Sequence, residues 1–458
     1  MLKKTQWPPG LVGEIAEYIY FSSIKPIKEV SIAAAIGLMS GITNRCYSIQ
    51  GTGLNAYIIV LCKTGIGKEE CANGISRIVN AMTDKHPKAN IEKFIGPGDF
   101  SSGQALLKRL QTQPSFYALL GEIGETLKKI SSPKAASYES SFRTALLDLY
   151  NKSGPGNRLL TKAYSDSSKD LEPVKRPGVT LLGESNPNTF FEGMSESVIA
   201  NGLIPRFTIV EYDGDRPETN YFAFIDEDRT QVKAPPKDLI KKIATITESC
   251  CIANETNSNT AVKMSKEARK MLDDFDKETT KIINNSDQEI VLQLWNRAHL
   301  KSLKLAALLA VSNDFLEPVI TENEAAWALD FTRNEVESIL KRYNSGSMSG
   351  GAAQREYDLV NCVNKFLVMN GSSKRKYKIP ESIINSPEPV IPYGYISRYL
   401  KQRSSFANNN TDTMRLIKET ISDMITSDKL IEVSSIESWE IFETRAKLYL
   451  KGPQWPTY

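Results

Sequence analysis

The chain has 458 residues, of which 41% are hydrophobic and 24% are charged, and its formal net charge is +3. These values are typical of a soluble globular protein that is long enough for two or three domains. So small a net charge does not by itself indicate nucleic-acid binding, and any contact with DNA must come from local patches.

The residue counts argue against several kinds of site. The six cysteines form no C-x-x-C pair, and the only histidines are His86 and His299. A zinc site, a histidine-based catalytic triad and a disulfide scaffold are therefore not expected. No apolar run reaches the length of a membrane span, and the first residues lack the apolar core of a signal peptide. We expect a cytoplasmic protein with reduced cysteines.

Two helices are predicted near the start, over residues 11–22 and 31–41, from the spacing of their apolar residues. The second helix consists of small and apolar residues, which favour burial against a neighbour. We assign residues 1–50 to a helical N-terminal collar whose expected role is core packing.

A short apolar run from Leu54 breaks into a glycine-rich turn that ends at Lys68, and a helical pattern then continues to Met82. A buried strand, a glycine turn and a helix start place backbone N–H groups and one lysine around a single point, as in a phosphate-binding loop. An ordinary strand-to-helix turn that exposes a lysine is the alternative. The predicted nucleotide-binding residues are Thr64, Gly65, Ile66, Gly67, Lys68 and Glu69.

The match to the pattern G-x-x-x-x-G-K-[ST] is incomplete. Cys62 stands at the first glycine position, and Glu69 stands where a hydroxyl normally binds Mg²⁺. Gly65 and Gly67 can still adopt positive φ, and Lys68 can still reach the β- and γ-phosphate oxygens.

A second buried strand is predicted over residues 115–122, with Gly121 and Glu122 at its end. ATPases of this build have Asp-Glu there: the first carboxylate holds Mg²⁺ and the second orients the attacking water. Glu122 can orient water, but Gly121 cannot hold a metal. We propose that Glu69 supplies the missing Mg²⁺ ligand. In the opposite interpretation, Glu69 repels the triphosphate and the site is degenerate.

A helix over residues 140–151 precedes a polar stretch, 152–177, that is compatible with a hairpin. Basic side chains on such a hairpin could face a DNA channel, or they could simply form a solvated face. The basic residues in question are Arg158, Lys162, Lys169, Lys175 and Arg176.

A third buried strand is predicted over residues 178–187, with Asn186 at its polar end. A helix over 188–201 follows, and Arg206 then precedes a strand over 208–212. The order of these features is that of a hexameric AAA+ ATPase: a phosphate loop, an acidic strand end, a strand ending in Asn, and an Arg after the next helix.

Residues from about 7 to 340 resemble a phage and prophage family of primase-associated helicase-like proteins, which shares its ATPase plan with superfamily 3 helicases. The resemblance implies an AAA+-like ATPase core over residues 51–215. It also implies that Asn186 senses the γ-phosphate and that Arg206 reaches the ATP of the neighbouring subunit. The segments that carry it are WPPGLVGEIAEYI, LNAYIIVLCKTGIGKEE, FYALLGEIGE, LLGESNP and NGLIPRF.

Residues 216–343 are expected to form a helical lid, in which Arg297 could contact the nucleotide as a second sensor or could lie on a solvated helix face. Its predicted helices cover residues 237–249, 265–285, 287–313 and 321–343.

Residues 344–353 are a Gly/Ser-rich linker, and residues 354–458 are predicted to form a winged-helix domain. Its third helix would enter the major groove of DNA, although such domains also dock proteins. The three predicted helices cover 355–370, 395–403 and 411–427, and the wing strands cover 429–433 and 447–451. The predicted DNA contacts are Lys374, Arg375, Lys376, Arg398, Lys401, Arg403 and Arg415.

The expected fold is therefore α/β, with a P-loop AAA+-like parallel sheet, flanking helices and a C-terminal winged helix. The expected function is an ATP-dependent DNA helicase or translocase that acts as a hexameric ring in phage or mobile-element replication in a bacterial host. ATP and Mg²⁺ would be its cofactors, and single-stranded or forked DNA and a primase its partners. A nucleotide-regulated replication initiator or helicase loader, and a degenerate DNA-binding scaffold, are the alternatives.

Overall fold

The computed structural model describes residues 6–132, 135–161, 170–192, 199, 201–344, 352–406 and 413–456. The chain divides into two compact units, Met1–Ser338 and Ile339–Tyr458. The division falls within helix α12 (Glu322–Asn344), and most of the predicted linker over 344–353 lies outside the described residues.

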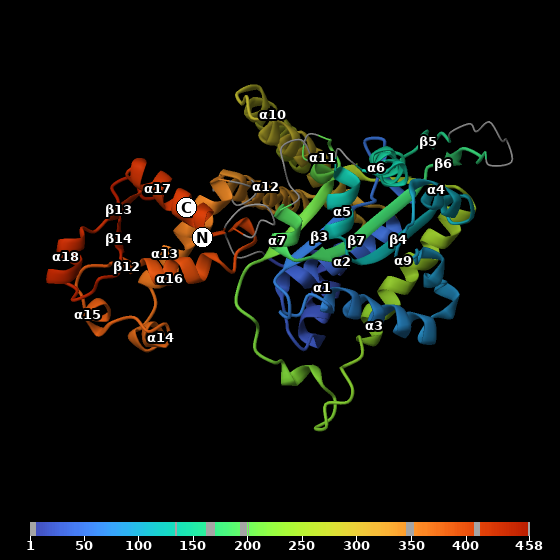
Figure 1. Cartoon of the computed structure of the whole chain (residues 1–458). Coiled ribbons are helices and arrows are strands. Elements are labelled where there is room, and N and C mark those ends of the chain that lie inside the picture. The colour runs from blue at the N-terminus through green and yellow to red at the C-terminus, as the bar shows by residue number, and fades with distance from the viewer. Residues whose placement is uncertain are drawn as a thin grey trace. The chain divides into compact units, whose positions relative to one another are not determined.

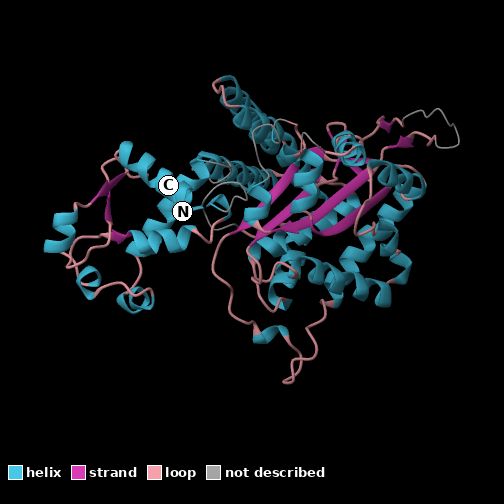
Figure 2. Cartoon of the chain, viewed as in Figure 1, coloured by secondary structure: helices cyan, strands magenta, loops and turns pink. Residues whose placement is uncertain are grey.

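The first unit is built on a parallel sheet of four strands, shown in magenta in Figure 2. The strand order is β4 (Ser115–Glu122), β7 (Gly178–Ser185), β3 (Tyr57–Cys62) and β8 (Phe207–Tyr212). Strand β3 is buried along its whole length, as expected for a central strand with both faces covered. The mixed α/β class with a parallel sheet, predicted from these four apolar runs, is confirmed.

The N-terminal helices pack directly on this sheet. In α2 (Lys28–Thr43) every residue from Val30 to Thr43 is buried. A Cβ added to Gly41 would lie 2.4 Å from the Cβ of Tyr117, so only glycine lets the helix approach β4 this closely. Helix α1 (Gly10–Ser22) packs on α2. The predicted collar is thus part of the core that supports the sheet.

Helices α3, α6, α9, α10 and α11 fall close to the predicted ranges, and α5 was not predicted. Helix α7 matches only the start of the helix predicted over 188–201, most of whose later residues lie outside the described part of the chain. Ser102 caps α4 by accepting a hydrogen bond from the N–H of Ala105, as its position before the helix predicts. Among the described residues, no helix combines the length and apolarity needed to cross a lipid bilayer. The remaining helices are α3 (Glu70–Lys85), α4 (Gly103–Thr112), α5 (Gly124–Ser131), α6 (Ser137–Leu149), α7 (Pro187–Glu192), α9 (Lys237–Glu255), α10 (Lys266–Asn284) and α11 (Glu289–Asn313), with short 3₁₀ turns at Pro87–Ala89, Ile91–Phe94, Ile204–Arg206 and Tyr221–Ala223.

Several very short strands complete the unit. The predicted hairpin is present as the antiparallel pair β5 (Arg158–Leu159) and β6 (Val174–Lys175), with residues 162–169 outside the described part of the chain. Two small sheets were not predicted, because strands of two or three residues leave no periodic pattern in a sequence. They comprise β1 (Tyr47–Ile49), β2 (Thr52–Gly53) and β9 (Thr260–Ala261), and β10 (Lys263–Met264) paired with β11 (Val319–Ile320).

Arg176, predicted to face a DNA channel, is buried, with 6% of its surface exposed. Its guanidinium donates to the backbone oxygens of Arg45 and Ser258 and to the side chain of Asn257. The basic side chains of this stretch were expected to face either a DNA channel or solvent, and Arg176 does neither, because its guanidinium is taken up by these internal hydrogen bonds.

The second unit has its own core of apolar residues from helices and strands. Its three longer helices are α13 (Ala352–Leu367), α16 (Tyr393–Leu400) and α17 (Thr413–Thr426), close to the predicted ranges. The predicted strand pair is present in an antiparallel sheet of order β12-β14-β13. The remaining elements are α14 (Gly371–Lys376), α15 (Glu381–Ile384), α18 (Ser435–Glu440), β12 (Ile391–Pro392), β13 (Leu430–Glu432), β14 (Leu448–Lys451) and a 3₁₀ turn at Ser404–Phe406.

Candidate functional site

The loop between β3 and α3 has the conformation that its glycines predict. Gly65 has φ of 75° and Gly67 has φ of 121°, a region that residues with a Cβ rarely adopt. A Cβ on Gly67 would also lie 2.5 Å from the Cβ of Lys25. Cys62, at the first glycine position of the pattern, is the last buried residue of β3 and has no positive φ. Its side chain therefore does not strain the loop.

Four of the predicted site residues meet at one edge of the sheet. The Nζ of Lys68 lies 2.6 Å from the Oε2 of Glu122, at the end of β4. The Nδ2 of Asn186, just after β7, donates to the Oγ1 of Thr64 in the loop at 3.2 Å. These contacts form because β4, β7 and β3 are adjacent and parallel, so their carboxyl ends lie side by side.

The charges at this edge influence one another. Burial acts to raise the pKa of Glu122, but hydrogen bonds from Lys68 and Ser185 outweigh it, and the pKa falls below its usual range. Glu122 is thus a carboxylate at neutral pH. Glu69, the predicted metal ligand, is exposed at the start of α3. No group of three or more His, Cys, Asp or Glu side chains that could hold a metal by themselves occurs among the described residues.

Glu184 is a further acidic residue at this edge that was not predicted from the sequence. It lies on β7, paired with Val60 of β3 and with Glu122 of β4. Burial raises the pKa of Glu184, while the charge of Lys68 lowers it and the charge of Glu122 raises it further. The polar end of the predicted strand over 178–187 was a signal for this residue, but its partners depend on strand order.

Two predicted residues lie elsewhere. Arg206 precedes β8, and Arg297 of α11 is close enough to lower the pKa of Arg206, although burial is the larger cause. Arg206 lies at the amino end of β8, whereas the loop follows the carboxyl end of the parallel strand β3. A strand of six residues spans about 20 Å. The structure therefore does not bring Arg206 or Arg297 to the loop of their own chain.

The guanidinium of Arg206 is turned toward its own chain. Its Nη1 donates to the backbone oxygen of Gly202, and its Cζ lies 5.9 Å from the ring centroid of Tyr150. The Nε is buried without a hydrogen-bond partner. Such an unsatisfied donor is costly in a folded protein.

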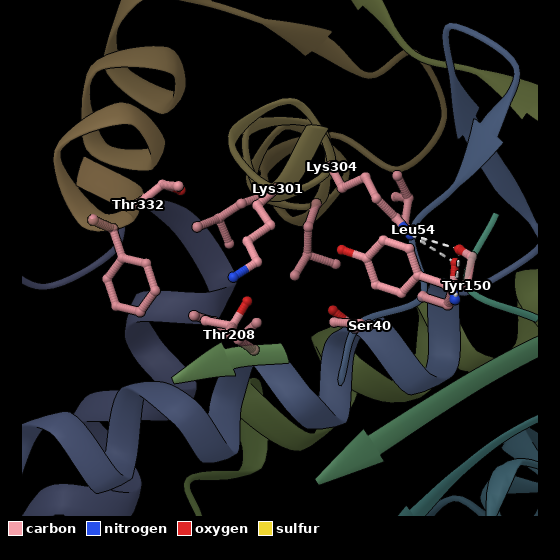
Figure 3. Close-up of a pocket in the computed structure, with 13 residues that line it drawn as sticks. Ser40, Leu54, Tyr150, Thr208, Lys301, Lys304 and Thr332 are labelled. Carbon is pink, nitrogen blue, oxygen red and sulfur yellow. Dashed lines mark hydrogen bonds between the residues drawn. The ribbon is translucent and has the colours of Figure 1, made fainter. Parts of the chain in front are cut away.

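A small cavity lies at the amino end of the sheet. Its volume is about 30 Å³, enough for a water molecule and far too small for a nucleotide. Figure 3 shows Lys301 and Lys304 extending from α11 beside it. Lys301 is paired with the buried Glu335 at 2.6 Å, whereas Lys304 donates to the Oδ1 of Asn55 at 2.8 Å. We interpret this cavity as part of the core.

Lys304 makes a testable contribution to stability. Burial lowers its pKa to about 7, whereas the unfolded chain keeps an ordinary lysine. Between about pH 7 and pH 10.4 the unfolded state binds the extra proton, so stability rises with pH in that range. We expect Lys304→Met to be more stable than the parent by about 2 kcal/mol at pH 7, with the difference vanishing toward pH 10.

Urea unfolding of the full chain, with hydrogen exchange measured over α11, would test this expectation. Lys266→Met, at the exposed start of α10, provides the control for loss of a charge. A Lys304→Met protein that is less stable than the parent at pH 7 would show that the buried amine is net stabilising.

The predicted DNA contacts of the second unit are spread over three helices and the turn after one of them. Figure 1 shows α14 and α17 at opposite ends of this unit, with α13 and α16 between them. The basic run of three residues lies in α14, and one arginine lies in α17. The seven residues are Lys374, Arg375 and Lys376 in α14, Arg398 in α16, Lys401 and Arg403 just after it, and Arg415 in α17.

Two of these arginines are already paired on the surface. Arg375 lies 2.7 Å from Glu381, and Arg415 lies 2.7 Å from Glu419. Exposed pairs of this kind contribute only about 0–1 kcal/mol, so a phosphate group could displace the glutamate. The side chains of Lys376, Arg398 and Lys401 are exposed as well.

No protein-family model matches the chain, and no curated protein matches it.

Proposed function

We propose that this chain is an ATP-dependent DNA helicase or translocase that works as a ring-shaped oligomer in the replication of phage or other mobile DNA. The observation that carries the proposal is the meeting of Thr64, Lys68, Glu122 and Asn186 at one edge of a parallel sheet. A glycine loop, a lysine, a strand-end carboxylate and a strand-end amide together suit binding and hydrolysis of a nucleoside triphosphate. The resemblance to superfamily 3 helicases supports ATP.

Each of these residues would have a defined task. The backbone N–H groups of the loop and the start of α3 would hold the phosphates. Lys68 would turn from Glu122 to the phosphate oxygens, which frees the Glu122 carboxylate to orient the attacking water. Asn186 would release its hydrogen bond to Thr64 and donate to the γ-phosphate instead. Bound Mg²⁺ would neutralise phosphate charge, and Glu69, exposed next to Lys68, would be one of its ligands.

The position of Arg206 supports an oligomer. Because it lies at the far end of the sheet from Lys68, it can act only on the nucleotide of another subunit. An arginine inserted in this way stabilises the charge that develops on the transferred phosphoryl group. The carboxyl end of the sheet would then bind the nucleotide of its own subunit, and the amino end would complete the nucleotide site of the neighbouring subunit. A closed ring requires two such different surfaces on each subunit.

Contacts with DNA would come from local basic surfaces. The β5–β6 hairpin includes the exposed Arg158 and Lys175. The second unit, with α13, α16 and α17 followed by β13 and β14, has the order of parts of a winged helix, in which α17 would enter the major groove. These surfaces would account for DNA binding despite the small net charge.

The proposal predicts ATP hydrolysis that requires Mg²⁺ and is stimulated by single-stranded DNA. We expect Glu122→Gln to bind ATP as the parent does and to hydrolyse it at least about 100-fold more slowly, because the amide cannot accept a proton from water. Glu125→Gln, an exposed glutamate at the start of α5, is the matched control. Steady-state hydrolysis, with and without DNA, checks both expectations, and full activity in Glu122→Gln would contradict the assigned role.

A nucleotide-regulated replication initiator or helicase loader is the second candidate. Gly121 and Glu69 favour it, because the strand aspartate and the loop hydroxyl that normally hold Mg²⁺ are both missing. This candidate predicts ATP binding and ATP-dependent assembly without strand separation. An unwinding assay on forked DNA distinguishes it from the motor.

A further inference from the structure

A β-bulge at the end of β4 alters which side chains share a face of the sheet. Leu119 pairs with Leu182 and Glu122 pairs with Glu184, so β4 contains one more residue than β7 over this span. Gly121, with φ of 54°, lies within the bulge. In a regular strand, residue 121 would stand opposite Glu184. The bulge moves Glu122 into that position.

Glu122 and Glu184 therefore face the same side of the sheet, because residues in register on parallel strands share a face. Lys68 is bonded to Glu122 on that side, and its charge lowers the pKa of Glu184. Glu184 additionally lies opposite Val60 of β3, the strand that leads into the loop. Two carboxylates and one lysine thus meet below the loop.

The Glu184 carboxylate is incompletely satisfied. Its Oε2 is buried and has no hydrogen-bond partner. A buried oxygen without a partner costs free energy that neighbouring apolar packing does not return. An oxygen of this kind, beside a phosphate-binding loop, fits a hard cation as its partner.

We propose that Glu184, alongside Glu69, supplies a protein carboxylate toward the Mg²⁺ of a bound nucleoside triphosphate, in place of the missing loop hydroxyl and strand aspartate, while Glu122 keeps its role with the attacking water. The inference rests on the proposed function. One or two carboxylates suffice when phosphate oxygens and waters complete the shell of Mg²⁺. The metal would therefore bind with the nucleotide, in keeping with the lack of a three-ligand group among the described side chains.

Binding measurements on the full chain can test Glu184 separately from hydrolysis. Calorimetric titration with the non-hydrolysable analogue AMP-PNP, with and without Mg²⁺, measures how much the metal tightens binding. We expect a tightening of about 10-fold in the parent and of at most about twofold in Glu184→Gln, with metal-free affinity unchanged in both. Glu172→Gln, an exposed glutamate before β6 at the other end of the sheet, should behave as the parent does.

A second measurement distinguishes a ligand from a structural residue. Without nucleotide, Glu184→Gln should unfold at the same temperature as the parent or higher, because it removes a buried charge with an unsatisfied oxygen. A lower unfolding temperature would overturn the proposal in favour of a structural role. Electron paramagnetic resonance with Mn²⁺ in place of Mg²⁺ should show weaker binding of the metal to the Glu184→Gln complex.

The failures of the two proposals are distinguishable. Absence of AMP-PNP binding in the parent would contradict the proposed function itself. If the parent binds AMP-PNP and Glu184→Gln shows the same dependence on Mg²⁺, only the inference on Glu184 would be overturned. Loss of the metal dependence in Glu69→Gln alone would likewise overturn it and assign the ligand to the loop.

Discussion

Replacement of Lys68 by alanine should abolish ATP hydrolysis, with a fall of at least about 100-fold, and should weaken ATP binding as well. Lys68 is the one lysine of the loop that points to the strand-end carboxylate, at 2.6 Å from Glu122. Without it the phosphates lose their direct cationic partner, and the nearby carboxylates repel them. The measurement is steady-state hydrolysis together with the thermal shift that ATP induces.

Lys63 offers a matched control for this experiment. It lies five residues earlier, on the same connection, and its Nζ donates to the backbone oxygen of Asp213 instead. Lys63→Ala should retain hydrolysis within about twofold, since exposed single contacts contribute little. Equal activity of the parent and Lys68→Ala would show that the loop does not bind the phosphates of ATP.

Replacement of Arg206 by alanine should reduce hydrolysis by about 1,000-fold while ATP binding is retained. Arg206 lies at the amino end of β8, and its own loop lies at the opposite edge of the sheet. The residue is therefore expected to act on a neighbouring subunit, which affects the transition state more than the bound nucleotide. Parallel binding and hydrolysis assays separate these two effects.

Mixing two inactive proteins provides a sharper test. An interface between an Arg206→Ala subunit and a Lys68→Ala subunit can combine the intact Lys68 of the first with the intact Arg206 of the second. Mixed rings should therefore regain hydrolysis that neither variant shows alone. Arg216→Ala, in an exposed loop, is the control for loss of an arginine. Failure of the mixture to regain activity, with lower stability of Arg206→Ala, would identify a structural role against Tyr150.

The local parts of the site followed well from the sequence. The apolar run before Cys62, the glycines of the loop and the helical pattern after it specify strand, turn and helix without reference to the rest of the chain. Lys68 and Glu122 were predicted to serve the same nucleotide site because a strand that ends in a carboxylate was expected to face it, and the structure brings the two side chains together.

The features that the sequence left undetermined depend on contacts between distant segments. The pairing of Glu184 with Glu122 follows from strand order and from a single bulge near Gly121, neither of which leaves a periodic signal. Arg297 lies in a basic helix that could have served as a sensor of the nucleotide. In the structure its charge instead lowers the pKa of Arg206. Arg176 looks like one more surface charge in the sequence, yet its guanidinium donates to the backbone oxygen of Ser258, more than 80 residues away in the chain.

The second unit shows the same limit on a smaller scale. Its longer helices and its strand pair were predicted from periodicity, and they occur close to the predicted positions. The basic run Lys374–Lys376 was grouped with Arg415 because both are positively charged. The structure separates them onto α14 and α17, since α14 and α15 form an insertion between the first and second predicted helices. DNA binding through α17 and binding through α14 are thus separate hypotheses.

The most direct test of the central claim is a titration of ATP and Mg²⁺ into the full-length parent, followed by calorimetry. A nucleotide site at the loop predicts saturable binding with about one ATP per chain and a dissociation constant below about 1 mM, with binding weakened in Lys68→Ala. Absence of binding at several millimolar ATP, in a protein whose unfolding is cooperative, would contradict it. The loop at Gly65 and Gly67 would then be a structural turn, and the function would have to lie elsewhere in the chain.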